Sequence, residues 1–141
     1  MTPSPAQLAG LHAEAFDSPW DETAFADLLS QTGVFAVAEV DGFILMRAVA
    51  DEAEIITLAV RPEARRLGLG GRLVGKGVLE AARRGAERVF LEVADGNTAA
   101  LGLYALAGFE SAGVRKGYYS RSDGTREDAR VLMLMLANRL P

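Results

Sequence analysis

The stretch Leu58–Gly75 reads LAVRPEARRLGLGGRLVG and joins the end of an apolar strand to the start of a helix. A proline-broken loop rich in arginine separates the two, and Gly68, Gly70 and Gly71 lie where the helix should begin. Glycines let the backbone turn tightly and approach a ligand, while the first turn of a helix exposes unpaired N–H groups and a partial positive charge. The sequence therefore predicts an anion site suited to a phosphate or pyrophosphate.

The spacing of the glycines separates this turn from two common nucleotide-binding loops. It is not GxxxxGK[ST], which excludes a P-loop, and it is not the GxGxxG of dinucleotide-binding folds. The motif is Arg65-x-x-Gly68-x-Gly70, preceded by the strand Ile55–Val60 and by Pro62. This arrangement resembles the acetyl-CoA pyrophosphate loop, [RQ]xxGx[GA], of the GCN5-related N-acetyltransferase (GNAT) superfamily. An ordinary glycine-rich connection with surface arginines is the alternative.

Length and composition exclude several other classes. The 141 residues fit one domain, residues 1–141, which is large enough to bury a core without disulfides or metals. The chain has no cysteine, which excludes a disulfide scaffold, a thiolate metal site and a cysteine nucleophile. The single histidine, His12, lies between Leu11 and Ala13 of a predicted helix. We interpret it as a helix residue and expect no metal site.

Charge is distributed unevenly along the chain. The formal net charge is −4, but residues 61–88 hold eight basic and three acidic residues, a net of +5, which leaves −9 for the remainder. The basic segment suits a partner with a phosphate tail, held by Arg61, Arg65, Arg66 and Arg72, and the acidic body suits a cationic partner; solvated helix faces are the alternative. The acidic total argues against a nucleic-acid-binding surface. With no visible signal peptide and no apolar run of the ~18 residues that a membrane span needs, we expect a soluble, cytoplasmic protein.

Apolar periodicity and turn residues divide the chain into helices and strands. Asp41-Gly42 suits a two-residue hairpin turn, Ser18 and Pro19 suit the start of a helix, and Gly85 suits the end of one. These signals predict an α/β fold in the order ααβββαβαββ, a single domain around one mixed sheet. The predicted helices are residues 6–16, 19–30, 70–85 and 97–106, and the predicted strands are residues 34–40, 43–49, 54–60, 87–93, 109–115 and 129–136, with a polar loop at 116–128.

Three polar residues are candidates for chemistry. Glu92 lies in the apolar strand Val89–Val93, where an ionisable group costs free energy unless it is paired or used, so it is either a general base or the partner of an arginine. Tyr104, on the following helix, lies in an apolar stripe typical of core residues, but its hydroxyl is able to protonate a leaving thiolate. Asn97 suits the N-cap of that helix, and a ligand contact there is compatible.

Longer runs make the resemblance more specific. They are Glu92-Val-Ala-Asp-Gly-Asn97-Thr-Ala-Ala-Leu-Gly-Leu-Tyr104, Arg115-Lys-Gly-Tyr118-Tyr119, Asp123-Gly-Thr-Arg-Glu127-Asp128 and, near the front, Phe16-Asp-Ser-Pro19-Trp20. Together they resemble the RimI branch of the superfamily, the bacterial ribosomal-protein alanine N-acetyltransferases and their N-terminal acetyltransferase relatives. The resemblance covers nearly the whole chain.

The resemblance implies roles for individual residues. Glu92 would be the general base and Tyr104 the general acid. The residues that would contact acetyl-CoA, the expected cosubstrate, are Leu58, Ala59, Val60, Arg65, Arg66, Leu67, Gly68, Leu69, Gly70, Gly71, Asn97 and Tyr104. The residues that would line the groove for the acceptor are Trp20, Tyr118, Tyr119, Asp123, Glu127 and Asp128. One departure is Gly96, at a position where relatives often have serine.

The expected reaction is transfer of an acetyl group from acetyl-CoA to the α-amine of a protein N-terminus, with the N-terminal alanine of a small-subunit ribosomal protein as acceptor. An α-amine has a pKa of about 7.7–8.0 against about 10.4 for lysine, so one carboxylate can deprotonate it at modest cost. Because the chain has no cysteine, direct attack in a ternary complex is the simpler route. Two alternatives stay open: a GNAT enzyme that acetylates lysine side chains, polyamines or another small amine, and a non-catalytic acetyl-CoA sensor or complex subunit.

Overall fold

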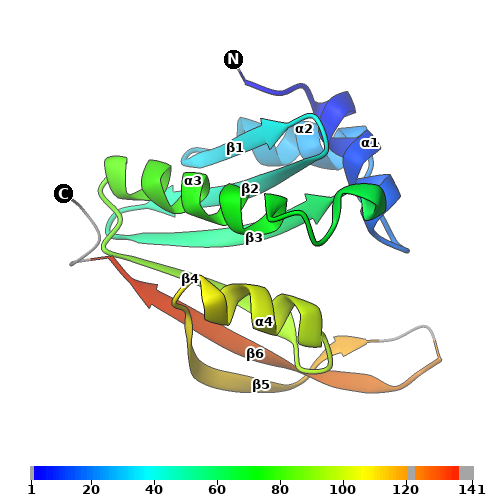
Figure 1. Ribbon diagram of the computed structural model, residues 1–141, viewed down its shortest axis with the longest axis vertical. Coiled ribbons are helices and arrows are strands. Elements are labelled where there is room, and N and C mark those ends of the chain that lie inside the picture. Colours follow the sequence, from blue (N-terminus) through cyan, green and yellow to red (C-terminus); the bar gives the residue numbers. More distant parts are fainter. Residues whose placement is uncertain (1, 121–122, 137–141) are drawn as a thin grey trace.

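The computed structural model describes residues 2–120 and 123–136. The elements are α1 Pro5–Ala15, α2 Glu22–Ser30, β1 Val34–Glu39, β2 Gly42–Val49, β3 Glu52–Val60, the 3₁₀ turn η1 Pro62–Ala64, α3 Leu69–Arg83, β4 Arg88–Ala94, α4 Thr98–Leu106, β5 Glu110–Ser120 and β6 Arg126–Met135. The strands form one mixed sheet in the order β1-β2-β3-β4-β6-β5. Helices α1 and α2 lie on one face of the sheet and α3 and α4 on the other (Figure 1). The predicted order ααβββαβαββ is confirmed.

Strand β2 is the centre of the first half of the sheet because both of its faces are covered. Phe43 and Leu45 pack with apolar residues of α1 and α2, while Ile44 and Met46 face α3. All four are fully buried. Gly77 of α3 lies so close that a Cβ there would stand 2.7 Å from the sulfur of Met46, so the helix needs a glycine at this crossing. The packing holds α3, and with it the glycine loop, against the sheet.

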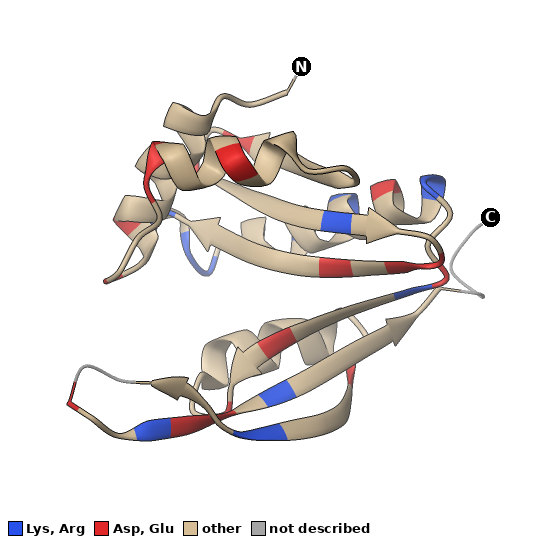
Figure 2. Ribbon diagram, turned by 180° about the vertical axis from the view of Figure 1, so that it is seen from behind, with Lys and Arg blue, Asp and Glu red and all other residues tan. Residues whose placement is uncertain are grey.

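Strands β3 and β4 are parallel neighbours that pair over only part of their length. Their pairing runs from Glu52 opposite Arg88 to Glu54 opposite Phe90 and then ends. Beyond this point the two strands diverge, as Figures 1 and 2 show. The second half of β3 therefore has backbone N–H and C=O groups without a partner in β4. Such groups are hydrogen-bonding positions for a ligand.

The second helix begins later than the sequence predicts. Ser18 is not its N-cap; Asp21 is, because its Oδ1 accepts a hydrogen bond from the backbone N–H of Ala24 at 2.9 Å. If the helix began at Pro19, the backbone N–H of Trp20 would belong to its first turn and point along the helix axis toward the cap. That amide instead donates to Nδ1 of His12 at 3.1 Å, which holds the segment outside the helix.

Residues 116–120 and 126–128 are strand, so the polar loop predicted for residues 116–128 is wrong at these positions. Strands β5 and β6 extend into this segment and pair there, with Tyr119 opposite Glu127. Because β5 is an exposed edge strand, its polar side chains are not desolvated, and its composition looks like that of a loop. The register shifts between Arg115 and Tyr119, where Gly117 has φ +61°.

The ends of α3 agree closely with the sequence. The helix begins at Leu69, one residue before the predicted start, and Gly85 follows its end with φ +99°, a conformation that favours glycine. No helix in the described ranges is long and apolar enough to cross a membrane.

Candidate active site

The glycine loop joins β3 to α3 and contains two residues with left-handed backbone conformations. Arg66 has φ +67° and Gly68 has φ +83°, and Gly68 is the N-cap of α3 without a capping side chain. The N–H groups of Leu69, Gly70 and Gly71 consequently have no hydrogen-bond partner among residues 2–120 and 123–136. Unpaired amides at the start of a helix attract an anion. These are the donors that the predicted pyrophosphate site requires.

Arg65 and Arg66 flank the turn in different ways. Arg65 donates from Nε to the carbonyl of Val60 at 3.3 Å and from Nη2 to the carbonyl of Ala15 at 3.2 Å. It thereby ties the loop both to β3 and to the end of α1. Arg66 is exposed and has neither a hydrogen bond nor an ion pair in the described part of the chain. Its charge is the one most available to a phosphate.

Two of the four arginines expected to supply charge to a phosphate are paired with carboxylates instead. Arg72 Nη2 lies 2.7 Å from Oε1 of Glu39 on β1, and Lys76 Nζ lies 3.0 Å from its Oε2. The hydrogen bonds from Arg72 and then Lys76 lower the pKa of Glu39 to about 2. Arg61 Nε lies 3.1 Å from Oε2 of Glu14 on α1. The expectation that all four serve the phosphate is therefore wrong for the free protein.

The rest of the basic segment is also paired. Arg84 Nε lies 2.9 Å from Oε2 of Glu80 in the same helix, and Arg88 Nη2 lies 3.1 Å from Oδ2 of Asp51 at the start of β3. The acidic residues come partly from elements outside the segment, so a count along the sequence does not reveal the neutralisation. The expected basic patch is thus reduced to the glycine loop itself.

Glu92 lies on the face of the sheet that α4 does not cover. Its neighbours Leu91 and Val93 point into the core beneath α3 and α4, so by the alternation of a strand Glu92 points to the opposite face. On that face the described helices lie over the other half of the sheet only (Figure 2). Glu92 is nevertheless largely buried, with 15% of its side chain exposed.

The two carboxylate oxygens of Glu92 have different surroundings. Oε1 lies 3.3 Å from Nη1 of Arg115 on β5. Oε2 is buried and accepts no hydrogen bond within residues 2–120 and 123–136. A buried acceptor without a donor costs free energy that an incoming N–H group recovers. The salt bridge that the sequence left open is present, and it still leaves one oxygen for a ligand.

Two tyrosines of β5 lie around Glu92. The hydroxyl of Tyr119 donates to the carbonyl oxygen of Glu92 at 3.3 Å, and burial together with the Glu92 charge raises the pKa of Tyr119. Tyr118 is half exposed; its ring lies edge-on to Tyr119, with centroids 5.1 Å apart, and beneath the guanidinium of Arg115 at 5.3 Å. The fold thus brings both predicted acceptor tyrosines to the candidate base.

Tyr104 is buried on α4 and has 5% of its surface exposed. Its ring lies edge-on to Phe109 at 5.5 Å, and burial raises the pKa of its hydroxyl. The hydroxyl makes no hydrogen bond within the described part of the chain. The neighbouring Leu103 packs on the glycine loop, where a Cβ at Gly70 would stand 3.3 Å from Cδ2 of Leu103. This glycine therefore lets α4 lie beside the start of α3.

Asn97 caps α4 as predicted, since its Oδ1 accepts a hydrogen bond from the N–H of Ala100 at 3.2 Å. The turn before it is held by Glu127, whose Oε2 accepts a hydrogen bond from the N–H of Gly96 at 2.6 Å. A Cβ at position 96 would collide with that oxygen. The glycine found where relatives often have serine is thus matched to the Glu127 carboxylate.

The other acidic residues predicted for the acceptor groove hold turns. Asp128 Oδ1 accepts a hydrogen bond from the N–H of Gly117 at 2.8 Å, which fixes the irregular part of β5. Asp123 Oδ1 accepts hydrogen bonds from the N–H and Oγ1 of Thr125, at 2.9 and 2.6 Å. Their contact with an acceptor stays a prediction. No group of three or more His, Asp or Glu side chains suited to a metal occurs within the described ranges.

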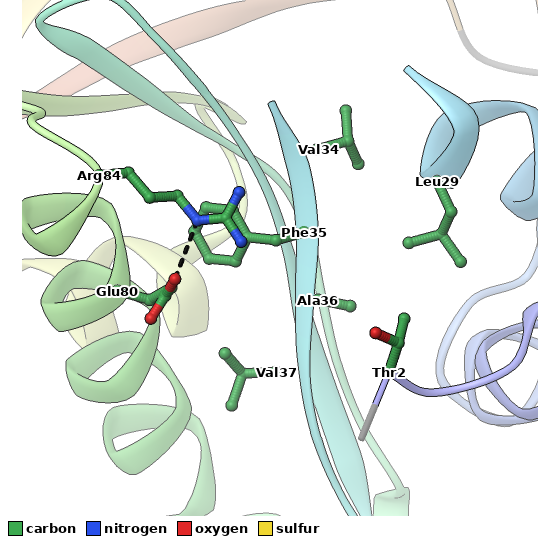
Figure 3. A pocket seen from close by; sticks show the side chains of 8 residues that line it. All are labelled: Thr2, Leu29, Val34, Phe35, Ala36, Val37, Glu80 and Arg84. Carbon is green, nitrogen blue, oxygen red and sulfur yellow. Dashed lines mark hydrogen bonds and ion pairs between the residues drawn. The ribbon is translucent and has the colours of Figure 1, made fainter. Parts of the chain in front are cut away.

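A hollow open to solvent lies elsewhere, along the edge strand β1. Its volume is about 470 Å³, and it is lined by residues on both sides of that strand. Figure 3 shows Phe35, with Arg84 stacked on it and paired to Glu80, on the α3 side, and Leu29 and Thr2 on the other. None of the predicted site residues lines this hollow.

Residues 6–109, which include the glycine loop, Glu92 and Tyr104, match the model of the acetyltransferase (GNAT) family. The chain belongs to this family. The GNAT match confirms the resemblance on which the site residues were chosen, and the fold agrees with it.

Relatives place this GNAT protein among the RimI-type N-acetyltransferases. The [ribosomal protein bS18]-alanine N-acetyltransferase of Escherichia coli K12 is 37% identical over 134 residues, which are 89% of this chain and 85% of that protein. A protein of Bacillus subtilis named as a putative enzyme of the same kind is 32% identical over 132 residues. The chain is accordingly an N-acetyltransferase.

Solved GNAT structures share the fold. The crystal structure of the Escherichia coli ribosomal-protein-S18-alanine N-acetyltransferase matches with a TM-score of 0.82 at 31% identity, over 97% of this chain and 92% of that one. Arabidopsis thaliana NAA60 in complex with acetyl-CoA matches with a TM-score of 0.83 at 18% identity, over 96% of both chains.

Two residues of this GNAT site were not assigned a role from the sequence. Arg115 was quoted only as part of a motif, yet it is the ion-pair partner of Glu92. In the sheet, Glu92 of β4 lies opposite Val131 of β6, and Val131 lies opposite Gly113 of β5, two residues before Arg115. The register of the three strands would therefore have indicated the ion pair. His12 was interpreted only as a helix residue, and no pattern along the chain signals its contacts.

Proposed function

We propose that this GNAT protein acetylates the α-amine of a protein N-terminus, with acetyl-CoA as donor and the N-terminal alanine of ribosomal protein bS18 as acceptor. The observation that carries the proposal is the buried Oε2 of Glu92, which lies beside the tyrosine pair of β5 and has no hydrogen-bond partner among the residues that the structure describes. The relative at 37% identity is named for this activity. We place the reaction in the cytoplasm, where ribosomal proteins are made.

The phosphates of the donor suit the start of α3. The free amides of residues 69–71 and the unpaired guanidinium of Arg66 would hold them. Residues 58–60, on the half of β3 that has left β4, would hydrogen-bond the pantetheine arm. A backbone N–H near Val60 would polarise the thioester carbonyl, which favours attack on its carbon. Asn97 would contact the donor from the start of α4.

Glu92 acts as the general base in this proposal. Its Oε2 takes a proton from the α-ammonium, directly or through a water molecule, while Arg115 keeps Oε1 in place. The amine nitrogen then forms a bond to the acetyl carbon. The proton on Glu92 returns to solvent after product release. A positively charged acceptor is favoured because the free carboxylate oxygen lacks any donor of its own.

Tyr104 acts as the general acid. The carbon–sulfur bond of the thioester breaks as the new carbon–nitrogen bond forms, and the Tyr104 hydroxyl gives its proton to the departing sulfur. The second proton that the nitrogen loses as it becomes an amide restores the Tyr104 hydroxyl, directly or through water. Burial raises the pKa of Tyr104, so the hydroxyl keeps its proton until the thiolate develops. The contact between Leu103 and Gly70 supports a position near the donor.

The acceptor is proposed to lie between two aromatic walls. Tyr118, half exposed, and Tyr119 form the wall on β5, and Trp20, 37% exposed, forms the wall at the corner between α1 and α2. Asp123 and Glu127 add negative charge on the β5–β6 side. Such a groove suits a basic peptide segment after the first residue.

The proposal is tested with two peptides that begin with alanine, contain one internal lysine and differ only in a blocked N-terminus. We expect thiol release and a mass gain on the α-amine of the free peptide alone, and loss of both in Glu92→Gln. If the internal lysine were acetylated in both peptides, the acceptor would be a lysine side chain and not the α-amine. Tight acetyl-CoA binding without any product, with polyamines also tried, would reject catalysis in favour of a sensor.

A further inference from the structure

His12 is a buried titratable residue that the proposed chemistry does not use. It lies near the end of α1 and is only 3% exposed. Both of its ring nitrogens are engaged: Nδ1 accepts a hydrogen bond from the backbone N–H of Trp20 at 3.1 Å, and Nε2 lies 3.3 Å from Oγ1 of Thr57 on β3. A histidine that merely fills a core needs neither contact. The contacts connect two parts of the proposed site.

The hydrogen bonds determine the state of the ring. Because the amide of Trp20 is only a donor, Nδ1 must be the unprotonated nitrogen, and Nε2 then donates to Thr57 Oγ1. Burial lowers the pKa of His12, which favours this neutral form. A second ring proton would face the Trp20 N–H donor. The neutral imidazole is therefore the state that keeps the hydrogen bond between α1 and the backbone of Trp20.

The same ring is enclosed by aromatic side chains of the corner. Phe16 stacks on it with centroids 4.2 Å apart and planes inclined by 19°, and Trp20 stacks with centroids 4.9 Å apart and planes inclined by 20°. Phe25 of α2 meets it edge-on at 5.4 Å. Trp20 is more than one-third exposed, so burial alone does not fix its ring. The imidazole supplies a stacking surface and accepts the backbone hydrogen bond, and Phe25 packs against the Trp20 ring with centroids 5.7 Å apart.

We propose that His12 is a positioning residue for the acceptor: it fixes Trp20 as one wall of the peptide groove, and its contact with Thr57 anchors the ring to β3. Thr57 directly precedes residues 58–60, the stretch expected to contact acetyl-CoA. The proposal rests on the proposed function, since it takes the acceptor to be a peptide N-terminus. It assigns His12 to the binding of that peptide and not to proton transfer.

Two substitutions separate the two contacts. His12→Leu removes both ring nitrogens and the stacking. His12→Asn removes the contact with Thr57 but keeps an oxygen, Oδ1, where Nδ1 accepts the Trp20 amide. Loss of both hydrogen bonds and of the stacking should raise the KM for the peptide about tenfold in His12→Leu, while kcat and the KM for acetyl-CoA change no more than about twofold. His12→Asn should recover most of the peptide KM.

Trp20 is the only tryptophan of the chain, so its fluorescence reports directly on the corner. In the wild-type protein, a saturable change of Trp20 fluorescence on addition of the alanine peptide is expected, and this measurement needs no variant. In His12→Leu the fluorophore should become more accessible to acrylamide, with thermal unfolding used to show that the fold is kept. His12→Asn should resemble the wild type in acrylamide quenching.

The outcomes distinguish the inference from the proposed function. Unchanged peptide KM in His12→Leu, or no fluorescence response of the wild type to the peptide, would overturn the role of His12 while α-amine acetylation stands. Equal losses in kcat and in both KM values, unrepaired by His12→Asn, would also overturn it, because they indicate a general structural role. Failure of the wild type to acetylate any α-amine would instead remove the proposed function.

Discussion

Replacement of Tyr104 by phenylalanine separates its packing from its proposed chemistry. The ring, which lies edge-on to Phe109 at 5.5 Å, is kept in Tyr104→Phe, and only the hydroxyl is lost. That hydroxyl has no hydrogen-bond partner in the described residues, and it is not one of the fully buried polar atoms, so its loss leaves no unpaired group and removes no partner. We therefore expect the unfolding free energy to change by less than about 1 kcal/mol, which shifts Tm by no more than about 4 °C.

The effect of the same substitution on turnover should be large. A positioned general acid contributes about 10²–10⁴-fold. The leaving group is a thiolate, whose parent thiol has an ordinary pKa of about 8.5, so it departs tolerably without a proton and the lower limit applies. The expected loss in kcat is about 10²-fold, or about 2.7 kcal/mol of transition-state stabilisation. KM values should change little, since the hydroxyl acts only as the carbon–sulfur bond breaks.

The assay is thiol release under saturating peptide and acetyl-CoA, beside urea unfolding of the same preparations. Phe109→Leu is the matched control: it weakens the ring packing of Tyr104 but keeps the hydroxyl, so it should lower stability by about 1 kcal/mol and leave kcat within about twofold. Wild-type kcat in Tyr104→Phe would refute the acid role and leave Tyr104 as a core residue. Because burial raises the pKa of Tyr104, no loss of activity from its ionisation is expected up to pH 9.

Substitutions at four other positions test the surroundings. Glu92→Gln should lower kcat at least about 10²-fold while acetyl-CoA binding, followed by calorimetry, is kept. Arg115→Gln should lower kcat/KM about tenfold because Glu92 loses the partner of Oε1, and Arg115→Lys should recover part of it; equal rates in all three proteins would exclude a positioning role. Glu39→Gln should lower the urea midpoint at pH 7, and the difference from wild type should vanish as pH falls from 4.5 to about 2, since the folded state lowers the pKa of Glu39 and its stabilisation is lost when that carboxylate is protonated. Gly96→Ala should displace the Glu127 carboxylate and cost about 1 kcal/mol in urea unfolding, and unchanged stability would show that this carboxylate moves freely.

The sequence predicts the fold well wherever apolar periodicity is sustained. The order of elements and the end of α3 before Gly85 are found in the structure. The β1–β2 hairpin is found too, but its two turn residues are Val40 and Asp41, one residue earlier than predicted, because Glu39 pairs with Gly42. The error at residues 116–128 has a physical cause: an exposed edge strand carries polar side chains without cost, so its composition does not differ from that of a loop. The error at Ser18 has a different physical cause. Nδ1 of His12 accepts a hydrogen bond from the backbone N–H of Trp20, which the predicted cap would have used.

The residues of the candidate site also differ in how clearly the sequence indicates them. Glu92 is conspicuous in the sequence because a charged residue in an apolar strand violates the local pattern, and that violation is visible without the fold. Arg115 and His12 violate no local pattern. Their partners lie across the sheet or far along the chain, and the contact between His12 and Thr57 spans 45 residues. Only a known register or a tertiary contact can indicate such residues.

The arginines of the glycine loop show why unpaired groups are more informative than charge counts. Four of them favour a phosphate when the sequence is considered alone, yet folding pairs Arg72 with Glu39, which is 33 residues away, and Arg61 with Glu14. Within residues 2–120 and 123–136, the guanidinium of Arg66 and the amides at the start of α3 remain unpaired. On β4, an oxygen of Glu92 has no partner in the same residues. The fold neutralises the other charges nearby. It leaves N–H groups and a guanidinium where a phosphate is expected, and a carboxylate oxygen where an ammonium is expected. This separation of positive and negative groups is the physical basis for placing acetyl-CoA and the acceptor amine on opposite sides of the diverging strands β3 and β4.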